Sequence, residues 1–275
     1  MQISGSIVLY QNNEELLKKA VYSFLNTSMD VKLYLIDNSP TDNLRYLSNI
    51  DERVEYIYNN ANLGFGKAHN IAINKSITDG TSYHLVLNPD AYFEQGVMEE
   101  LHEYMQANQD VANIIPKTFY PNGKLQYLCN LLPTPIELIA RRFIPLDKMV
   151  QKINHKYELH DFDYDKILNV PFLNGCFMFL RVEHLKNIGL FDENIFMYME
   201  DTDLNRRLHA KYKTIFYPKV SITHVHERGS HKNKSLLIAH IKSTIYYFNK
   251  YGWFFDSFRR EKNREVQEII KKYKI

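Results

Sequence analysis

The chain has 275 residues, of which 45% are apolar and 24% are charged, and its net charge is +2 at pH 7. This length provides one sizeable core plus an appendage and excludes two full independent domains. The start has no secretory signal, no segment has the length of a membrane-spanning helix, and Cys129 and Cys176 lack the spacing of metal ligands, so we expect a cytoplasmic protein with ordinary thiols.

The first half of the chain alternates short β-rich runs with helical patterns. β-branched and aromatic residues predict four strands, at residues 6–10, 31–36, 54–58 and 83–87. Apolar spacing and the loops between the strands predict helices at about residues 16–24, 67–76 and 96–108. This alternation is typical of an α/β fold with a mostly parallel central sheet flanked by helices.

The sequence is less regular at residues 116–170. This stretch resembles neither a linker nor a second domain. Order returns with predicted strands at residues 177–180, 214–217 and 220–224 and a helix from about residue 199 to Ala210. From Ser235 onward the pattern is helical to the end of the chain.

Polar residues that follow the predicted strands are candidate ligands, because open α/β sheets bind ligands at the carboxyl ends of their strands. Those that qualify are Asp37, Asn62, Gly64 and Asp90. Asp37 can accept a hydrogen bond from the imide nitrogen of uracil or thymine, or it can stabilise an Asx turn before Pro40. Asp90 suits a hard cation that bridges two phosphate oxygens, or it is a turn carboxylate without a ligand.

The loop at residues 62–67 contains two glycines, which allow the backbone to approach a nucleotide closely. It lacks the third glycine of a Rossmann fingerprint and the Gly-Lys-Ser/Thr ending of a P-loop. Ordinary turn chemistry at a helix start is the alternative interpretation.

The densest carboxylate cluster, Glu-Asp-Thr-Asp at residues 200–203, lies at the start of a predicted helix. These carboxylates can provide a general base or bind a cation, or they can cap the helix and offset its dipole. His224 and His226 lie on one face of a predicted strand, and such a pair can bind a metal. No third ligand follows at a familiar spacing.

In this order, the segments resemble the GT-A glycosyltransferases, specifically the inverting family two, from about Ile7 to Ser230. The most specific segments are similar to the acceptor side of the active site in bacterial rhamnosyltransferase-like members. They are residues 174–178, 189–193, 196–198 and 200–204. The resemblance implies a GT-A catalytic domain at residues 1–230 and a basic, aromatic-rich helical extension at residues 231–275.

The resemblance also implies a role for each candidate residue. The nucleotide would be bound by Tyr10, Asn12, Asp37, Asn62 and Gly64. Asp201 would be the catalytic base, and the acceptor or donor-sugar pocket would include Asn174, Gly175 and Glu200. Asp90 and His224 would hold a divalent metal, Mg²⁺ or Mn²⁺. The paired-acid metal motif of many GT-A enzymes is represented here by Asn88-Pro89-Asp90, with only its last acid, a form that the rhamnosyltransferase-like branch often shows.

The implied reaction is an in-line displacement in which Asp201 takes the proton of an acceptor hydroxyl and the sugar is inverted. The donor would be a UDP- or dTDP-sugar that carries a hexosyl or deoxyhexosyl residue, and dTDP-rhamnose is a narrower alternative. The acceptor would be a growing bacterial surface glycan (lipopolysaccharide, O-antigen or capsule), including a lipid-linked oligosaccharide. Two other classes stay open: a zinc-dependent hydrolase that uses His224, His226 and Asp201 or Asp203, and a non-catalytic protein that binds a nucleotide sugar or glycan.

The tail at residues 231–275 has 11 Lys or Arg against 4 Asp or Glu, a net charge of +7, which leaves −5 on the remaining residues. Apolar residues recur at helical spacing in Ile238, Ile241, Ile245 and Phe248, and aromatic residues surround Gly252. This mixture fits an anionic membrane surface, here the inner face of the cell membrane. It also fits packing on the catalytic body or on a second subunit of a homo-oligomer. We do not expect a nucleic-acid partner.

Overall fold

The computed structural model describes residues 2–138, 147–225 and 234–273. Its centre is a sheet with the strand order β3-β2-β1-β4-β10-β6-β11-β5, in which β8 pairs with β11, and β7 and β9 form a separate pair. The strands of the central sheet are β1 (Ile3–Leu9), β2 (Val31–Asp37), β3 (Val54–Tyr58), β4 (Tyr83–Leu87), β5 (Ala91–Phe93), β6 (Val111–Phe119), β8 (Leu168–Asn169), β10 (Phe177–Arg181) and β11 (Lys213–His224). The separate pair consists of β7 (Cys129–Asn130) and β9 (Phe172–Leu173).

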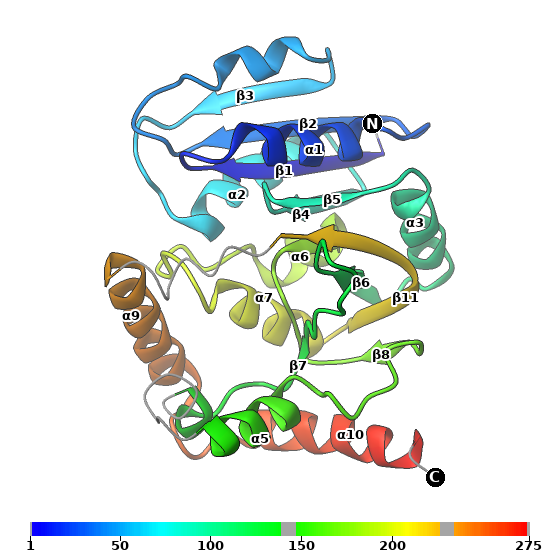
Figure 1. Cartoon of the computed structure of the whole chain (residues 1–275), viewed down its shortest axis with the longest axis vertical. Helices are drawn as coiled ribbons and strands as arrows, with labels where there is room; N and C mark the ends of the chain where they lie inside the picture. The colour runs from blue at the N-terminus through cyan, green and yellow to red at the C-terminus, as the bar shows by residue number, and fades with distance from the viewer. Residues whose placement is uncertain (1, 139–146, 226–233, 274–275) are drawn as a thin grey trace.

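Helices cover both faces of the sheet (Figure 1). The helices are α1 (Glu14–Leu25), the 3₁₀ helix η1 (Arg45–Asn49), α2 (Phe65–Thr78), α3 (Val97–Ala107), α5 (Asp147–Tyr157), α6 (Val182–Ile188), α7 (Glu200–His209), α9 (Lys234–Tyr251) and α10 (Ser257–Tyr273). Apolar residues of α1 and α3 pack on one face, and those of α2, α6 and α7 pack on the other. The central strands β4 and β10 are therefore buried along their whole length, which explains why they do not alternate with polar residues.

The predicted α/β fold is confirmed, with differences in the sheet. The sheet is mixed, with four parallel and four antiparallel pairs in the described residues: β10 lies antiparallel between β4 and β6, and β5 and β8 pair antiparallel with β11. The two strands predicted around Pro218 form one strand, β11, and a register shift between Tyr217 and Ser221 accommodates the proline. β6 was not predicted, because its Pro116 is unusual in a central strand.

The register of the strands brings the candidate residues to one edge of the sheet. β1 lies between β2 and β4, with Leu9 opposite Asp37 and Ile7 opposite Leu87. β10 runs antiparallel to β4, with Phe177 opposite Leu87. The residues that follow β1, β2 and β4 therefore lie along the same edge as those that precede β10.

The C-terminal helices pack on the rest of the chain. Val266 and Ile270 of α10 enter a second core with the segment around Leu131, and Tyr247 and Phe248 of α9 pack with Met199. Other apolar residues of α9 are 41–53% exposed, namely Ile238, Ile241 and Ile245. The tail thus has one face in the core and one face in solvent.

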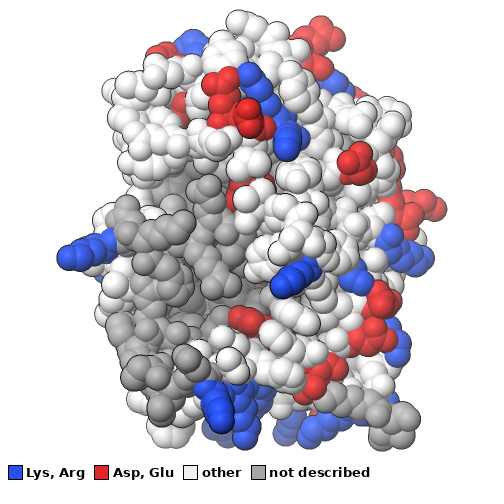
Figure 2. All heavy atoms as spheres, in the orientation of Figure 1, with Lys and Arg blue, Asp and Glu red and all other residues white. Residues whose placement is uncertain are grey.

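Basic side chains gather at the lower edge of the molecule in Figure 2, which is the edge that α5 and α10 form in Figure 1. Exposed basic residues of α10 are Arg260, Arg264, Lys271 and Lys272. None of the helices in the described residues is both long enough and apolar enough to cross a bilayer.

Candidate functional site

Asp37, at the end of β2, is completely buried. Its Oδ1 accepts a 2.7 Å hydrogen bond from the backbone N–H of Ser39, and its Oδ2 accepts a hydrogen bond from the Tyr56 hydroxyl. Burial, followed by the hydrogen bond to Asp37, raises the pKa of Tyr56, so the phenol keeps its proton. The Asx turn that the sequence allowed is therefore present, and a nucleotide base reaches this carboxylate only if a neighbouring side chain moves.

Tyr10 and Asn12 form a tight turn directly after β1. The backbone N–H of Tyr10 donates to Oδ1 of Asn12 at 2.7 Å, and the Tyr10 side chain is 49% exposed. An exposed aromatic ring at the edge of the sheet can stack on a nucleotide base.

The glycine loop before α2 contacts the segment that leads into α7. Gly64 has φ +83°, and a Cβ atom at this position would lie 2.1 Å from the carbonyl oxygen of Phe196. Asn62 Oδ1 accepts the N–H of Gly64 at 3.0 Å, and Asn38 Nδ2 donates to the Gly64 carbonyl at 3.1 Å. Both the conformation and the close approach require glycine here. Sequence reasoning missed Asn38, which it treated only as part of a turn.

Asp201 lies in the first turn of α7 and is partly exposed. Its Oδ2 accepts the backbone N–H of Gly175 at 2.9 Å, and its Oδ1 accepts the N–H of Thr202 at 2.7 Å. A Cβ atom on Gly175 would lie 3.0 Å from the Asp201 Cβ, so glycine also allows this approach. Cys176, the next residue, accepts the backbone N–H of Asn88 through its carbonyl at 2.9 Å, which links Asp201 to the end of β4.

Glu200 and Asp201 are adjacent carboxylates with different surroundings. Glu200 is 6% exposed, and its Oε2 is buried without a hydrogen-bond partner in the part of the chain that the structure describes. Burial, and then the nearby Asp201 charge, raise the pKa of Glu200 well above its usual range. Burial also raises the pKa of Asp201, but the N–H donors of Gly175 and Thr202 oppose this rise. Glu200 therefore keeps a proton more readily, and Asp201 is the member of the pair that ionises.

Asp90 and His224 lie side by side, with 3.4 Å between Asp90 Oδ1 and His224 Nε2. Nδ1 of His224 is 3.0 Å from Oε1 of Gln126, a residue in the irregular segment that no sequence signal identified. Burial opposes the charged imidazole, but Cys176 and the Asp90 carboxylate outweigh it and raise the pKa of His224 to about 10. His226, the other histidine of the predicted pair, lies outside the described residues.

The donor set at Asp90 and His224 fits a cation that is shared with a diphosphate. In the described residues, no group of three or more His, Cys, Asp or Glu side chains gathers to form a metal site made of protein alone. A cation here would have to displace the proton of His224 Nε2. Asp90 would then supply an oxygen donor and His224 a nitrogen donor, and Mg²⁺ commonly completes its shell with phosphate oxygens and water. The same absence gives the zinc-dependent hydrolase no support within the described residues.

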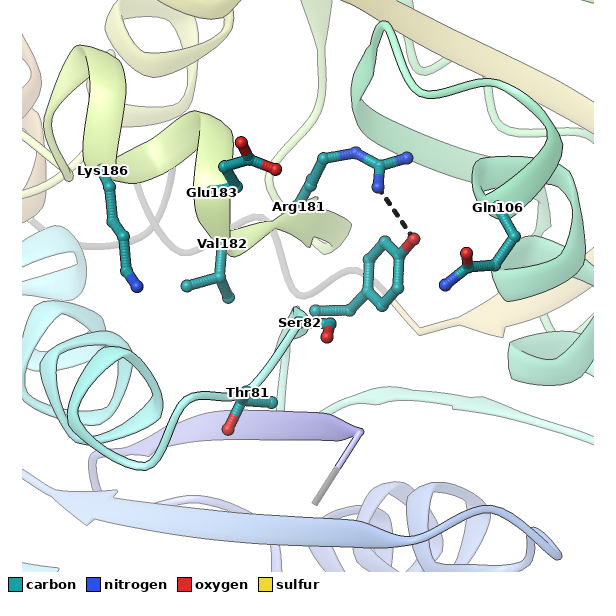
Figure 3. Close-up of a pocket in the computed structure, with 8 residues that line it drawn as sticks. Thr81, Ser82, Gln106, Arg181, Val182, Glu183 and Lys186 are labelled. Carbon is teal, nitrogen blue, oxygen red and sulfur yellow. Dashed lines mark hydrogen bonds between the residues drawn. The ribbon is translucent and has the colours of Figure 1, made fainter.

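A separate cavity of about 230 Å³ lies at the opposite, amino end of β4 (Figure 3). Arg181 lines it, but all five N–H groups of this guanidinium already donate to protein acceptors, among them the Tyr83 hydroxyl at 2.9 Å. This cavity is therefore distinct from the candidate site, and its arginine is structural.

Known proteins match this arrangement in sequence and in fold. The chain is 26% identical over 251 residues to an N-acetylglucosaminyl-diphospho-decaprenol L-rhamnosyltransferase of Mycobacterium tuberculosis, covering 83% of this chain and 78% of that protein. It is 24% identical to rhamnosyltransferase WbbL of Escherichia coli K12, covering 88% of this chain and 90% of that protein.

Two solved structures share the fold at low sequence identity. GalNAc-T7 with UDP, GalNAc and Mn²⁺ superposes with a TM-score of 0.61 at 15% identity, over 82% of this chain and 43% of that chain. S. aureus TarS 1–349 in complex with UDP superposes with a TM-score of 0.56 at 12% identity, over 88% of this chain and 65% of that chain. This chain thus spans less than two thirds of either structural neighbour. Both likenesses confirm the GT-A fold.

The family model described as glycosyl transferase family 2 matches residues 6–189, which include β1 to β4, β10 and the glycine loop. The match covers most of the candidate edge described above. The chain therefore belongs to glycosyl transferase family 2 and is a glycosyltransferase.

Proposed function

We propose that the chain is an inverting glycosyltransferase that transfers a hexosyl or deoxyhexosyl residue from a UDP- or dTDP-sugar to a hydroxyl of a bacterial surface glycan. One observation carries the proposal. The partly exposed Asp201 carboxylate is fixed by the N–H groups of Gly175 and Thr202, one residue away from the Cys176–Asn88 contact beside Asp90. A base and a candidate diphosphate site thus share one edge of the sheet.

In the proposed reaction Asp201 accepts the proton of the acceptor hydroxyl while the hydroxyl oxygen attacks the anomeric carbon. The two N–H donors hold the carboxylate in one orientation, and its raised pKa improves its match to a hydroxyl proton near neutral pH. Glu200 and Asn174 would contact the sugar or the acceptor. A divalent cation held by Asp90 and His224 would stabilise the negative charge of the departing diphosphate.

The nucleotide would lie along the ends of β1 and β2. The exposed Tyr10 ring would stack on the base, with Asn12 beside it, and Asn62 and Gly64 would lie along the nucleoside. Asp37 would accept the imide N–H after the Tyr56 hydroxyl turns away. The names of both curated relatives describe rhamnosyl transfer, which favours a deoxyhexosyl donor such as dTDP-rhamnose.

The experiment is a thermal-shift screen of UDP- and dTDP-sugars with Mg²⁺, Mn²⁺ or EDTA, followed by transfer assays with the donors that bind. We expect one class of nucleotide sugar to raise Tm in the presence of a metal, and NMR of the product to show an inverted anomeric configuration. A retained configuration would overturn the inverting mechanism. Binding without transfer to any lipid-linked or soluble glycan would favour the non-catalytic alternative.

The same proposal includes docking of the C-terminal helices on an anionic membrane surface, where a lipid-linked acceptor would be found. Phe254 is 66% exposed and Phe255 is 92% exposed at the turn between α9 and α10. The tail that contains this turn has a net charge of +7. Exposed aromatic residues beside basic residues suit the headgroup region of an anionic bilayer.

Flotation with anionic vesicles tests the docking. The full-length protein should float at low salt and dissociate as salt rises, and a variant with Phe254→Ser and Phe255→Ser should float less. Tyr22→Ser removes a 53% exposed aromatic residue from α1 and serves as the control. If the double variant floats as well as the control, the membrane proposal is wrong. Light scattering without lipid then tests whether the exposed residues of α9 join two copies of the chain.

A further inference from the structure

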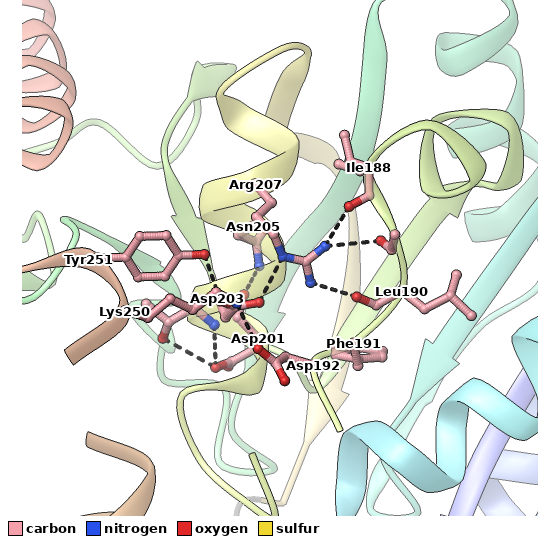
Figure 4. Close-up of polar contacts among 12 residues, drawn as sticks. Ile188, Leu190, Phe191, Asp192, Asp201, Asp203, Asn205, Arg207, Lys250 and Tyr251 are labelled. Atoms are coloured by element: carbon pink, nitrogen blue, oxygen red, sulfur yellow. Dashed lines mark hydrogen bonds and ion pairs between the residues drawn. The ribbon is translucent and has the colours of Figure 1, made fainter. Parts of the chain in front are cut away.

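Helix α7 contacts the C-terminal helices on the side away from Asp201. Asp203, two residues later, has a fully buried side chain. Its Oδ1 accepts hydrogen bonds from Lys250 Nζ and from the Tyr251 hydroxyl, both at 2.7 Å, and its Oδ2 accepts from Arg207 Nε at 2.8 Å (Figure 4). The acidic cluster read from the sequence therefore has two parts: Glu200 and Asp201 serve the candidate site, and Asp203 connects α7 to α9.

A second contact joins the next turn of α7 to the start of α10. Arg206 forms a two-point ion pair with Asp256, at 2.6 and 2.8 Å, and the two side chains are 8% and 2% exposed. The Arg206 guanidinium also lies over the Tyr251 ring, 4.0 Å from its centroid. Removing one member of such a buried pair leaves a charge without its partner, so the contact strongly favours one position of α7.

Helix α9 also holds the segment that leads into α7. Lys250 Nζ bonds to Asp192 at 2.7 Å as well as to Asp203, so one ammonium group spans the ends of residues 192–203. Ser243 donates to the carbonyl of Met197 at 2.8 Å. These contacts enclose the turn that directs Glu200 and Asp201 toward the site.

That turn is strained. Tyr198 and Met199 are consecutive non-glycine residues with φ of 65° and 70°. The left-handed conformation costs about 1–2 kcal/mol for each such residue, and it persists only where surrounding contacts impose it. Without the contacts from α9, the turn would lower its energy by leaving the left-handed conformation. This change would move Asp201 away from the N–H of Gly175.

We propose that Lys250, Tyr251 and Asp256 are positioning residues for the catalytic carboxylate: the C-terminal helices fix α7 and its strained first turn so that Asp201 stays in its catalytic orientation. This inference rests on the proposed role of Asp201. It gives the extension a part in the transfer step that does not depend on membrane contact.

The test compares Lys250→Met, Lys250→Arg and Tyr251→Phe with Tyr273→Phe, a control that removes a hydroxyl from the exposed end of α10. We expect Lys250→Met to lower kcat about tenfold or more, since small misplacements of catalytic groups cost up to about 10²-fold. KM for the donor and the Kd for the nucleotide should stay within about twofold, because the nucleotide side is untouched. Tyr251→Phe should show a smaller loss of kcat, and Lys250→Arg should recover part of it.

Three results separate the possible failures. A lower Tm with unchanged kcat per folded molecule would make these residues structural and overturn the inference. A fall in KM and kcat that the Arg variant does not relieve would also overturn it. If Asp201→Asn retains wild-type turnover, the proposed role of Asp201 as the base is wrong, whatever the Lys250 variants do.

Discussion

The two sides of the candidate site are held by contacts of very different sequence separation. On the nucleotide side, polar side chains bond to backbone groups two residues away, in the pairs Asp37–Ser39, Asn12–Tyr10 and Asn62–Gly64. On the proposed acceptor side and at the neighbouring metal site, the partners are far apart in sequence: 26 residues for Asp201–Gly175, 47 for Asp203–Lys250 and 98 for His224–Gln126. The nucleotide side therefore depends partly on short-range contacts, together with the Tyr56–Asp37 and Asn38–Gly64 bonds, which join residues 19 and 26 positions apart. The contacts of the second side form only when the whole fold is assembled.

The largest expected effect tests the long-range side. Asp201→Asn should lower kcat by roughly 10²-fold or more, because it removes proton acceptance with little change in volume. Nucleotide affinity should change by no more than a few-fold, since the proposed nucleotide side is intact. Steady-state kinetics and nucleotide titration measure both quantities. Asp110→Asn, at an exposed carboxylate beside Lys213, should change neither, and near-normal turnover in Asp201→Asn would remove this residue from the mechanism.

The next effect is expected where the two sides meet. Asp90 follows β4, yet its partner His224 lies at the end of β11. Asp90→Ala should weaken Mn²⁺ and nucleoside diphosphate binding together by about tenfold or more, a loss comparable to that of other metal-site partners. Calorimetric titration with and without metal gives both affinities. If EDTA leaves wild-type activity unchanged, the diphosphate is held by side chains and backbone alone.

A glycine substitution measures how strongly the two sides are joined. Gly64→Ala adds a Cβ that would lie 2.1 Å from the Phe196 carbonyl oxygen, at φ +83°. Gly80→Ala is the matched control, because Gly80 has φ +68° but no atom within 4 Å of its added Cβ. We expect about 1–2 kcal/mol of destabilisation from φ alone in the control and a larger loss in Gly64→Ala. Equal losses by urea unfolding would mean that the loop moves freely away from Phe196.

The smallest effect concerns the adjacent carboxylates. Because the pKa of Glu200 is raised in the folded chain, ionisation costs the folded state more than the unfolded state. The contribution of protonated Glu200 to the free energy of unfolding is complete below the usual Glu pKa of 4.5. It is lost as pH rises through the pKa of the folded chain. Glu200→Gln should therefore raise Tm relative to wild type at pH 8 and have little effect at pH 4. Glu268→Gln, at an exposed position, should show no such dependence in calorimetric scans.

This contrast also explains what the sequence could predict. The strands β3 and β4 were predicted with their observed bounds, since Val-Glu-Tyr-Ile-Tyr and Tyr-His-Leu-Val-Leu are unbroken runs between clear loops. The Asx turn at Asp37 is one of two interpretations that the sequence allows. It can be considered from the sequence because Ser39, which donates the hydrogen bond, lies only two residues after Asp37. Residues 147–157 form a helix inside a segment for which the sequence analysis predicts no element, although Met149, Val150, Ile153 and Tyr157 recur at helical spacing.

The roles of the residues on the proposed acceptor side could be predicted only from the family resemblance. Nothing in the spacing of Glu-Asp-Thr-Asp indicates that Asp203 faces Lys250 while Asp201 faces Gly175. Gln126 has no signal at all, because it reaches His224 only after β11 pairs beside β6. The pattern of the tail fits both membrane contact and packing, and the tail has residues of both kinds: Phe248 in α9 is buried, and Phe255 in the turn before α10 is 92% exposed.

The position of β10 has a consequence for synthesis of the chain. β4 pairs with β1 on one side and with β10 on the other, and β10 begins at Phe177, 90 residues after β4 ends at Leu87. At translation rates of about 5–20 residues per second, a nascent chain carries β4 with an open edge for roughly 5–20 s. An unpaired apolar edge is a template for intermolecular pairing, so ribosome-bound fragments that end before Phe177 should depend on chaperones to stay soluble.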